Sequence, residues 1–141
     1  MLPPHVLLVD DDPLDAELAR DVLEAPGVGA SVSVAHGGAD ALAFLGRAGP
    51  PPDLVLLDVN MPRLNGFEVL ARLKACARLA AVPVVLMSTS DDERDVRRGL
   101  GGGAAEYLVK PMRLEALEGL LRDLIARWSP RWRAASPSGP A

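Results

Sequence analysis

Short apolar stretches alternate with longer segments of helical periodicity along most of the chain. Five stretches are rich in β-branched or other apolar residues, and each precedes a segment whose apolar residues recur every three or four positions. The stretches are His5–Val9, Ser31–Ala35, Leu54–Leu57, Pro83–Met87 and Tyr107–Val109. This alternation predicts an α/β fold with a parallel sheet. The first, third and fourth stretches are almost wholly apolar, which predicts central strands covered by helices on both faces.

The helical segments carry start and stop signals of their own. Asp12 is the expected cap of the first helix, Pro13 suits its first position, and Asp15 is an acid in its first turn. Ser90 is the expected cap of the fourth helix, whose end is weakened by several glycines. The other helices are expected over 39–47, 67–78 and from Leu114 to Trp128.

Composition limits the number of domains and the class of protein. The 141 residues suit one domain, and 49% hydrophobic with 24% charged residues is typical of a globular protein. From Ser129 onward the residues are mostly Ser, Pro, Ala, Gly and Arg. We therefore predict a folded domain over 1–128 and a disordered tail over 129–141.

Several features bear on the compartment and on the partners. No apolar run approaches the ~20 residues that cross a bilayer, and the N-terminus lacks the pattern of a secretory signal. Cys76 is the only cysteine, so a disulfide within one chain is excluded. We expect a cytoplasmic protein with no membrane partner. The net charge of -4 argues against general attraction to nucleic acid, so a small molecule or a protein is the expected partner.

Acidic, hydroxyl and amine side chains follow four of the predicted strands. They are Asp10, Asp11, Asp12, Asp58, Ser88, Thr89 and Lys110. Open α/β sheets bind ligands at the carboxyl ends of their strands, so we expect these side chains to meet at one edge. Tyr107, the only tyrosine, is either a mobile surface ring or packed on the fifth strand.

Three of the acids predict a cation site. If Asp10, Asp11 and Asp58 lie close together, they repel one another and their pKa values rise unless a cation neutralises them. Carboxylate oxygens suit Mg²⁺, which keeps several waters and leaves a position for a phosphoryl oxygen. The alternative is that these acids only form a turn and a helix cap, a role that we assign mainly to Asp12.

Lys110 and the two hydroxyls complete the candidate chemistry. Only two of the 15 basic residues are lysines, and a compact ammonium at a strand end suits a carboxylate or phosphoryl oxygen, although a chance surface lysine is the alternative. The Lys110–Pro111 bond is a candidate for the cis form. Ser88 and Thr89 could donate to a phosphoryl oxygen, and capping or turn formation explains them about equally well. Such a set suffices for phosphoryl transfer to an aspartate.

Four motifs together resemble the receiver domain of two-component response regulators. They are Val9–Pro13, Leu57–Pro62 with Asn65-Gly66, Leu86–Ser90 and Tyr107–Pro111. The resemblance covers residues 5–128 and implies a doubly wound, flavodoxin-like sheet of five parallel strands in the order 2-1-3-4-5. It implies a signalling domain rather than an enzyme, although one that could catalyse its own phosphotransfer and dephosphorylation. Asp58 would accept a phosphoryl group from the phosphohistidine of a sensor histidine kinase or phosphotransfer protein.

The resemblance also implies roles for the other site residues. Mg²⁺ would be bound by Asp11, Asp58 and the backbone carbonyl of Asn60, with Asp10 acting through water. Lys110 and the switch residue Ser88 would contact the phosphoryl group. Movement of Ser88 would let Tyr107 turn inward and change the face formed by the fourth helix, fifth strand and fifth helix.

A narrower resemblance concerns the partner. Segments 10–15 and 88–92 and the aromatic end of the fifth helix resemble single-domain regulators partnered with phytochrome-type histidine kinases. This implies such a kinase as partner and a homodimer through the switch face. No output domain follows, so direct DNA binding is not expected. Two alternatives stay open: a phosphatase of the haloacid dehalogenase type with Asp10 as nucleophile, and an adaptor that works without phosphorylation.

Overall fold

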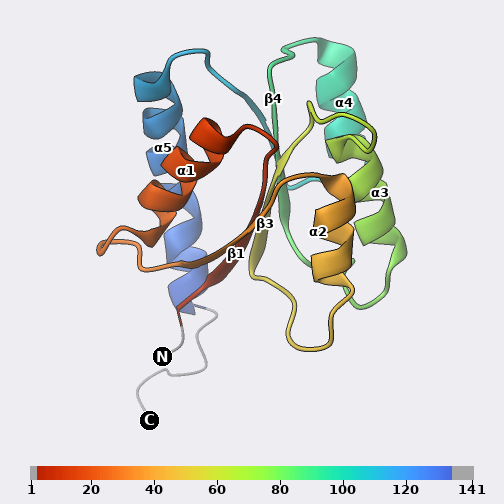
Figure 1. The fold of residues 1–141 in the computed structure, drawn as a ribbon, viewed down its shortest axis with the longest axis horizontal. Helices are drawn as coiled ribbons and strands as arrows, with labels where there is room; N and C mark the ends of the chain where they lie inside the picture. The colour runs from red at the N-terminus through yellow and green to blue at the C-terminus, as the bar shows by residue number, and fades with distance from the viewer. Residues whose placement is uncertain (1–2, 135–141) are drawn as a thin grey trace.

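The computed structural model describes residues 3–134, in which five strands alternate with five helices (Figure 1). The elements are β1 His5–Val9, α1 Pro13–Glu24, β2 Ser31–Ala35, α2 Gly38–Leu45, β3 Leu54–Asp58, α3 Gly66–Ala75, β4 Val84–Ser88, α4 Glu93–Gly101, β5 Glu106–Val109 and α5 Leu114–Ala134. All paired strands are parallel, and the sheet order is β2-β1-β3-β4-β5. The predicted doubly wound, flavodoxin-like fold is confirmed.

Helices cover both faces of the sheet. Helices α1 and α5 lie on one face, and α2, α3 and α4 lie on the other (Figure 1). Each layer encloses its own cluster of buried apolar side chains. Every residue of β3 and β4 is buried, and so are the last four of β1, as their apolar composition predicts. Among the described residues, no helix is both long and apolar enough to cross a membrane.

The helix starts follow the capping signals with one exception. Oδ1 of Asp12 accepts from the backbone nitrogens of Leu14 at 3.0 Å and Asp15 at 3.3 Å, so Asp12 caps α1 as predicted. The expected cap at Ser90 is wrong, because Asp92 occupies that position in α4. The Ser90 hydroxyl instead accepts from the backbone nitrogen of Asp92 at 3.1 Å. Ser90 therefore supports the turn that leads into the cap.

Two of the strands end one residue later than the apolar pattern indicates. Asp58 and Ser88 are the last residues of β3 and β4, and Asp58 is paired in register with Met87. These side chains are therefore held by the sheet rather than by a loop. The candidate cis bond before Pro111 is absent, since the described residues contain no cis peptide bond.

Helix α5 extends past the predicted domain boundary at residue 128. Residues 129–134 are helical, so the expectation of a disordered tail from Ser129 is wrong for this part; 135–141 lie outside the described residues. Contacts with β5 anchor the turn of α5 that precedes the extension. Both carboxylate oxygens of Glu106 on β5 accept bonds of 2.7 Å from α5, one from Arg127 and one from the Trp128 indole. The Arg131 guanidinium lies 4.4 Å from the centre of a Trp128 ring.

Candidate functional site

The predicted site residues meet at the carboxyl edge of the sheet. Asp10 follows β1, Asp58 and Ser88 end β3 and β4, and Lys110 follows β5. Main-chain bonds from neighbouring strands hold two of them. The nitrogen of Asp10 donates to the carbonyl of Ala35 at 3.0 Å, and the nitrogen of Lys110 donates to the carbonyl of Ser88 at 2.7 Å. The four side chains therefore project from a fixed backbone frame.

The Lys110 ammonium faces three carboxylates. Its Nζ lies 2.9 Å from Oδ2 of Asp10, 2.9 Å from Oδ2 of Asp15 and 3.7 Å from Oδ2 of Asp58. The Lys110 side chain is only 8% exposed. This burial acts to lower the pKa of Lys110, but the hydrogen bonds to Asp10 and Asp15 outweigh it and hold the pKa above its usual range. Lys110 is therefore a permanent cation at the centre of the acids.

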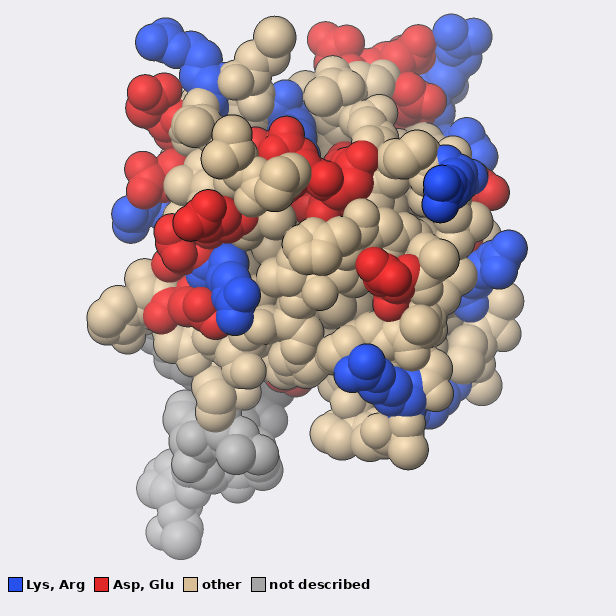
Figure 2. All heavy atoms as spheres, in the orientation of Figure 1, with Lys and Arg blue, Asp and Glu red and all other residues tan. Residues whose placement is uncertain are grey.

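Three acids form a cluster that can hold a second cation. One carboxylate oxygen from each of Asp10, Asp11 and Asp58 lies within 4.8 Å of the others. Figure 2 shows acidic side chains gathered toward the top of the view, between the two helical layers. Asp10 and Asp58 are buried, whereas Asp11 is exposed and open to solvent. A group of hard oxygens with excess negative charge and one open side fits a divalent cation that retains waters.

Asp58 belongs to this cluster and also faces Lys110. Its residue is 5% exposed, and its Oδ1 accepts a hydrogen bond of 3.0 Å from the backbone nitrogen of Asn60. Burial raises the pKa of Asp58 to about 7; Lys110 opposes this rise and the nearby Asp10 adds to it. Near neutral pH the carboxyl group is thus balanced between its protonated and ionised forms. Positive charge placed at the cluster favours the ionised, nucleophilic form.

Gly66 allows the start of α3 to approach Asp58 closely. A β-carbon at position 66 would lie 2.6 Å from the carbonyl oxygen of Asp58 and 2.7 Å from Cα of Val59. Asn65 caps the same helix and forms a reciprocal capping box with Glu68. The pair Asn65-Gly66 is therefore structural, and it also fixes the backbone that carries Asp58.

Asn60 links the loop after β3 to the loop after β4. Its Oδ1 accepts from the Thr89 nitrogen at 2.8 Å, the Thr89 hydroxyl at 3.2 Å and the Ser88 hydroxyl at 3.3 Å. Ser88 is 1% exposed, whereas Thr89 is exposed. The structure thus places the Ser88 hydroxyl inside the site and Thr89 at its surface. The contacts of the Asn60 side chain had no signal in the sequence, and only the family resemblance implied a role for its backbone carbonyl.

Tyr107 is partly buried and attached to the loop between β4 and α4. Its hydroxyl donates to the carbonyl of Ser90 at 2.8 Å. The backbone of Gly99 on α4 lies so close that a β-carbon there would be 3.0 Å from Cδ2 of Tyr107 and 2.7 Å from Cδ1 of Leu86. Of the two alternatives for this ring, the structure favours packing. The contact with Ser90 is already present, so no prior movement of Ser88 is needed to bring the ring to this loop.

Asp15 belongs to the site although its sequence signal indicated only a helix start. Its Oδ2 lies as close to Nζ of Lys110 as that of Asp10 does. The available clue was spacing, since a residue three positions after the cap lies on the same side of the helix as Asp12. That spacing alone does not reveal which strand end the side chain faces.

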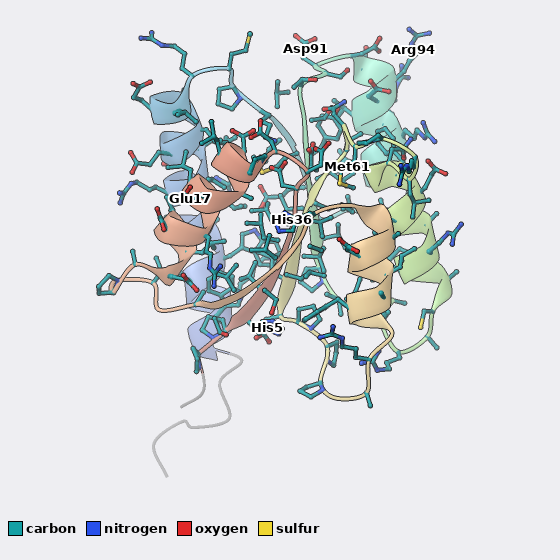
Figure 3. The ribbon with its side chains drawn as sticks, in the orientation of Figure 1. His5, Glu17, His36, Met61, Asp91 and Arg94 are labelled. Atoms are coloured by element: carbon teal, nitrogen blue, oxygen red, sulfur yellow. The ribbon has the colours of Figure 1, made fainter. Side chains whose placement is uncertain are left out.

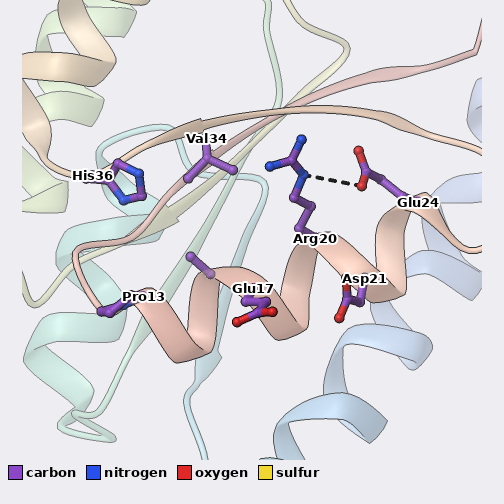
Figure 4. A pocket seen from close by; sticks show the side chains of 8 residues that line it. Pro13, Glu17, Arg20, Asp21, Glu24, Val34 and His36 are labelled. Atoms are coloured by element: carbon purple, nitrogen blue, oxygen red, sulfur yellow. Dashed lines mark hydrogen bonds and ion pairs between the residues drawn. The ribbon is translucent and has the colours of Figure 1, made fainter.

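Other chemically notable residues lie away from this edge. An open groove of about 420 Å³ runs between α1 and β2, and it contains the 3.2 Å ion pair of Arg20 with Glu24 (Figure 4). Its lining comprises Pro13, Ala16, Glu17, Arg20, Asp21, Glu24, Val34 and His36. His5 lies near the amino ends of the strands, well below Met61 in the view of Figure 3, and its Nε2 is 2.9 Å from the Ser33 hydroxyl. None of the predicted site residues lines the groove.

Comparison with known proteins finds relatives that match most of the chain. The family model "Response regulator receiver domain" matches residues 6–122. The chain is 34% identical over 131 residues to the response regulator Rcp1 of a Synechocystis species, a match that covers 89% of each protein. It is 32% identical over 137 residues to a probable methanogenesis regulatory protein, FilR2, of Methanothrix harundinacea, covering 94% of this chain and 88% of that one.

Solved structures agree with these matches. The phosphorylated cyanobacterial phytochrome response regulator RcpA superimposes with a TM-score of 0.85 at 31% identity, covering 97% of this chain and all of that one. The Mn²⁺-bound form of Rcp1 superimposes with a TM-score of 0.83 at 32% identity, covering 99% of this chain and all of that one. Each match spans nearly the full length of both chains, and the predicted family resemblance is confirmed.

Proposed function

The chain belongs to the response regulator receiver family of two-component signalling, and from that membership we propose that its phosphoacceptor is Asp58. The phosphoryl group would come from the phosphohistidine of a sensor histidine kinase or a phosphotransfer protein. One observation carries this assignment: Asp58 belongs to the acidic cluster and its Oδ2 lies 3.7 Å from Nζ of Lys110, beyond hydrogen-bond length, whereas both oxygens of Asp10 are engaged. It also ends a fully buried central strand, which fixes its position.

The residues around Asp58 suit a carboxylate nucleophile. In the transfer, a carboxylate oxygen of Asp58 forms a bond to phosphorus while the bond from phosphorus to the histidine nitrogen breaks, and the electron pair of that bond returns to the ring. Lys110 keeps its charge and can stabilise negative charge on the phosphoryl oxygens. Asn60 holds the carboxylate through its backbone nitrogen. These residues orient the acceptor, so the domain can promote its own phosphotransfer and dephosphorylation while its role is signalling.

A divalent cation, which we propose to be Mg²⁺, fits the acidic cluster. Asp11, Asp58 and the backbone carbonyl of Asn60 would hold it, with Asp10 acting through water. Support comes from the convergence of Asp10, Asp11 and Asp58 and from the related Rcp1, which has a Mn²⁺-bound form. The cation would neutralise charge on the acceptor and on the incoming phosphoryl oxygens.

The signal would leave through the β4–α4 loop. Phosphorylation adds roughly 1.5 to 2 negative charges beside Asp58, and the Ser88 hydroxyl is a donor that can turn from Asn60 toward them. Because Tyr107 is bonded to Ser90 in the same loop, a shift of Ser88 would be transmitted to β5 and α4. The face formed by α4, β5 and α5 is the surface through which we propose that the domain signals and forms a homodimer.

The proposed partner is a phytochrome-type histidine kinase. This rests on the similarity to RcpA, a phytochrome response regulator. Direct DNA binding is not part of the proposal. We place the protein in the cytoplasm, where the exposed, unpaired thiol of Cys76 would stay reduced.

The assignment of Asp58 is tested by the mass of the intact protein. Wild type, Asp58→Asn and Asp91→Asn are incubated with acetyl phosphate and Mg²⁺, with and without EDTA. Asp91 is an exposed acid near the start of α4 (Figure 3) and serves as the matched control. We expect one phosphoryl group on wild type and Asp91→Asn, and none on Asp58→Asn or in EDTA. A modified Asp58→Asn protein contradicts the assignment.

The same experiment separates the two alternative functions. Labelling at Asp10 would support a phosphatase, but both Asp10 oxygens are engaged, one by Lys110 and one by the backbone nitrogen of Asp12. Asp12 caps α1, so it is poorly placed to act as the second acid of such an enzyme. An adaptor would show neither acetyl phosphate labelling nor binding of beryllofluoride, a mimic of the phosphoryl group.

A further inference from the structure

We propose that Asp15 is a positioning residue that competes with Asp58 for the Lys110 ammonium and thereby weakens occupancy of the phosphoryl site. The inference rests on the proposed role of Asp58 as phosphoacceptor. Its basis is the distances around one atom. Nζ of Lys110 is 2.9 Å from Asp15 and 2.9 Å from Asp10, but 3.7 Å from Asp58.

The lysine therefore bonds two acids that do not accept the phosphoryl group. An ammonium has three donors, and Nζ of Lys110 lies at ordinary hydrogen-bond length from one oxygen of each of these two carboxylates. The distance to Asp58 lies beyond that length, although the two groups attract each other. A closer approach of Lys110 to an oxygen bound at Asp58 has to draw Nζ away from the position in which Asp10 and Asp15 now hold it. Asp15 is the one that can be released without disturbing the acidic cluster, because Asp10 belongs to that cluster and Asp15 does not.

The start of α1 fixes Asp15 in its competing position. Its backbone nitrogen donates to Oδ1 of Asp12 at 3.3 Å, and Asp12 caps the helix. The Asp15 side chain is 20% exposed, compared with 5% for Asp58, so water can solvate it when Lys110 moves away. Asp15 also adds a negative charge close to the place where a phosphoryl group would bring more. The hold on Lys110 and the added negative charge both act against a phosphoryl group on Asp58, whereas solvation of Asp15 limits the cost of releasing the lysine.

Replacement of Asp15 by asparagine tests the competition with a defined probe. Beryllofluoride affinity is measured at saturating Mg²⁺ for wild type, Asp15→Asn, Asp15→Glu and Glu17→Gln. Glu17 is an exposed acid two residues away on α1, and its substitution removes the same charge (Figures 3 and 4). We expect Asp15→Asn to bind beryllofluoride about three- to tenfold more tightly, the size expected for the net contribution of one ordinary hydrogen bond. Asp15→Glu should return toward wild type, and Glu17→Gln should match wild type.

A second measurement distinguishes positioning from a general effect of charge or stability. In a crystal structure of Asp15→Asn grown in EDTA, Nζ of Lys110 should lie within about 3.2 Å of an Asp58 oxygen. Beryllofluoride affinity that is unchanged or weaker in Asp15→Asn, while wild type binds normally, overturns the competition and leaves the role of Asp58 intact. So does a lysine that keeps its wild-type distance from Asp58. Failure of wild type itself to bind beryllofluoride and to accept phosphate overturns the proposed function and this inference together.

Discussion

The two lysines of the chain lie at opposite edges of the same sheet, and their partners differ in charge. Lys74, near the end of α3, donates from Nζ to the carbonyls of Ala80 at 2.9 Å and Val82 at 3.1 Å. Lys110, after β5, is surrounded by carboxylates. The first lysine satisfies neutral backbone acceptors and closes a turn. The second balances acids that would otherwise repel one another.

The difference shows which edge of the sheet carries unfavourable electrostatics. At the amino edge, Arg78 also donates only to carbonyls, those of Leu45, Arg47 and Gly49, so its side chain joins two loops. At the carboxyl edge, burial and repulsion raise the pKa of Asp58 to about 7. Sites that depart from local stability in this way are commonly functional. The cations at the amino edge thus stabilise loops, whereas the cation at the carboxyl edge lies among acids whose ionisation can change.

Removal of the Lys110 cation should give the largest effect. In Lys110→Gln the phosphoryl oxygens lose their fixed positive partner, and the rate of phosphorylation by acetyl phosphate should fall on the order of a hundredfold or more. The rate is measured by intact mass against time at saturating Mg²⁺. The matched control is Lys74→Gln, which should be phosphorylated at the wild-type rate. Equal rates for wild type and Lys110→Gln would remove the distinction between the two edges.

Removal of the Lys74 cation should instead reduce stability. Lys74→Met keeps an alkyl chain where the lysine now lies against Gly103, but it leaves two carbonyls without their donor. We expect the free energy of unfolding to fall by about 1–3 kcal/mol. Urea unfolding followed by circular dichroism measures the change. A loss of phosphorylation without a loss of stability would show that Lys74 acts on the site after all.

Neutralising Asp58 should stabilise the protein in a pH-dependent way. The pKa of Asp58 rises from an ordinary 3.8 to about 7 on folding, so wild type loses stability as the pH rises from about 4 through about 7. Asp58→Asn stays neutral and avoids that loss. In EDTA its advantage should be small at pH 4, grow through pH 7 and then level off at a few kcal/mol.

Thermal unfolding of wild type and Asp58→Asn across this pH range measures the difference. Mg²⁺ should stabilise wild type more than Asp58→Asn at pH 8, because the cation needs the ionised carboxylate. An advantage that is constant from pH 4 to 8 would contradict the raised pKa of Asp58.

The sequence was sufficient where the deciding contacts are local or periodic. The apolar runs predicted both ends of β1 and β2 correctly, and Asp12 indicated the start of α1. Strand ends then implied that Asp10, Asp58, Ser88 and Lys110 share one edge. This worked because a parallel sheet brings its carboxyl ends together whatever the details of the loops.

The sequence was insufficient where distant residues decide the outcome. The residues after Trp128 resemble a tail in composition, yet Glu106 on β5 anchors the preceding turn of α5 and the helix continues. Asp15 resembles an ordinary acid of a first helical turn, and only tertiary structure brings it to Lys110. The side chain of Asn60 is a similar case, because its partners lie on the next loop. Each of these contacts joins residues from different elements, which one-dimensional patterns do not encode.

An exposed ion pair should give the smallest effect and complete the comparison of cations. Arg122 on α5 lies 3.1 Å from Glu118, and the two side chains are 66% and 42% exposed. Water already solvates both charges, so Arg122→Ala should change the free energy of unfolding by less than about 0.5 kcal/mol and leave phosphorylation unaltered. Urea unfolding beside Lys74→Met, and phosphorylation beside Lys110→Gln, measure both quantities. Arg122 faces neither the backbone carbonyls that Lys74 binds nor the clustered acids that Lys110 binds. A large effect of Arg122→Ala would therefore mean that these two environments do not determine how much a cation contributes to stability or phosphorylation.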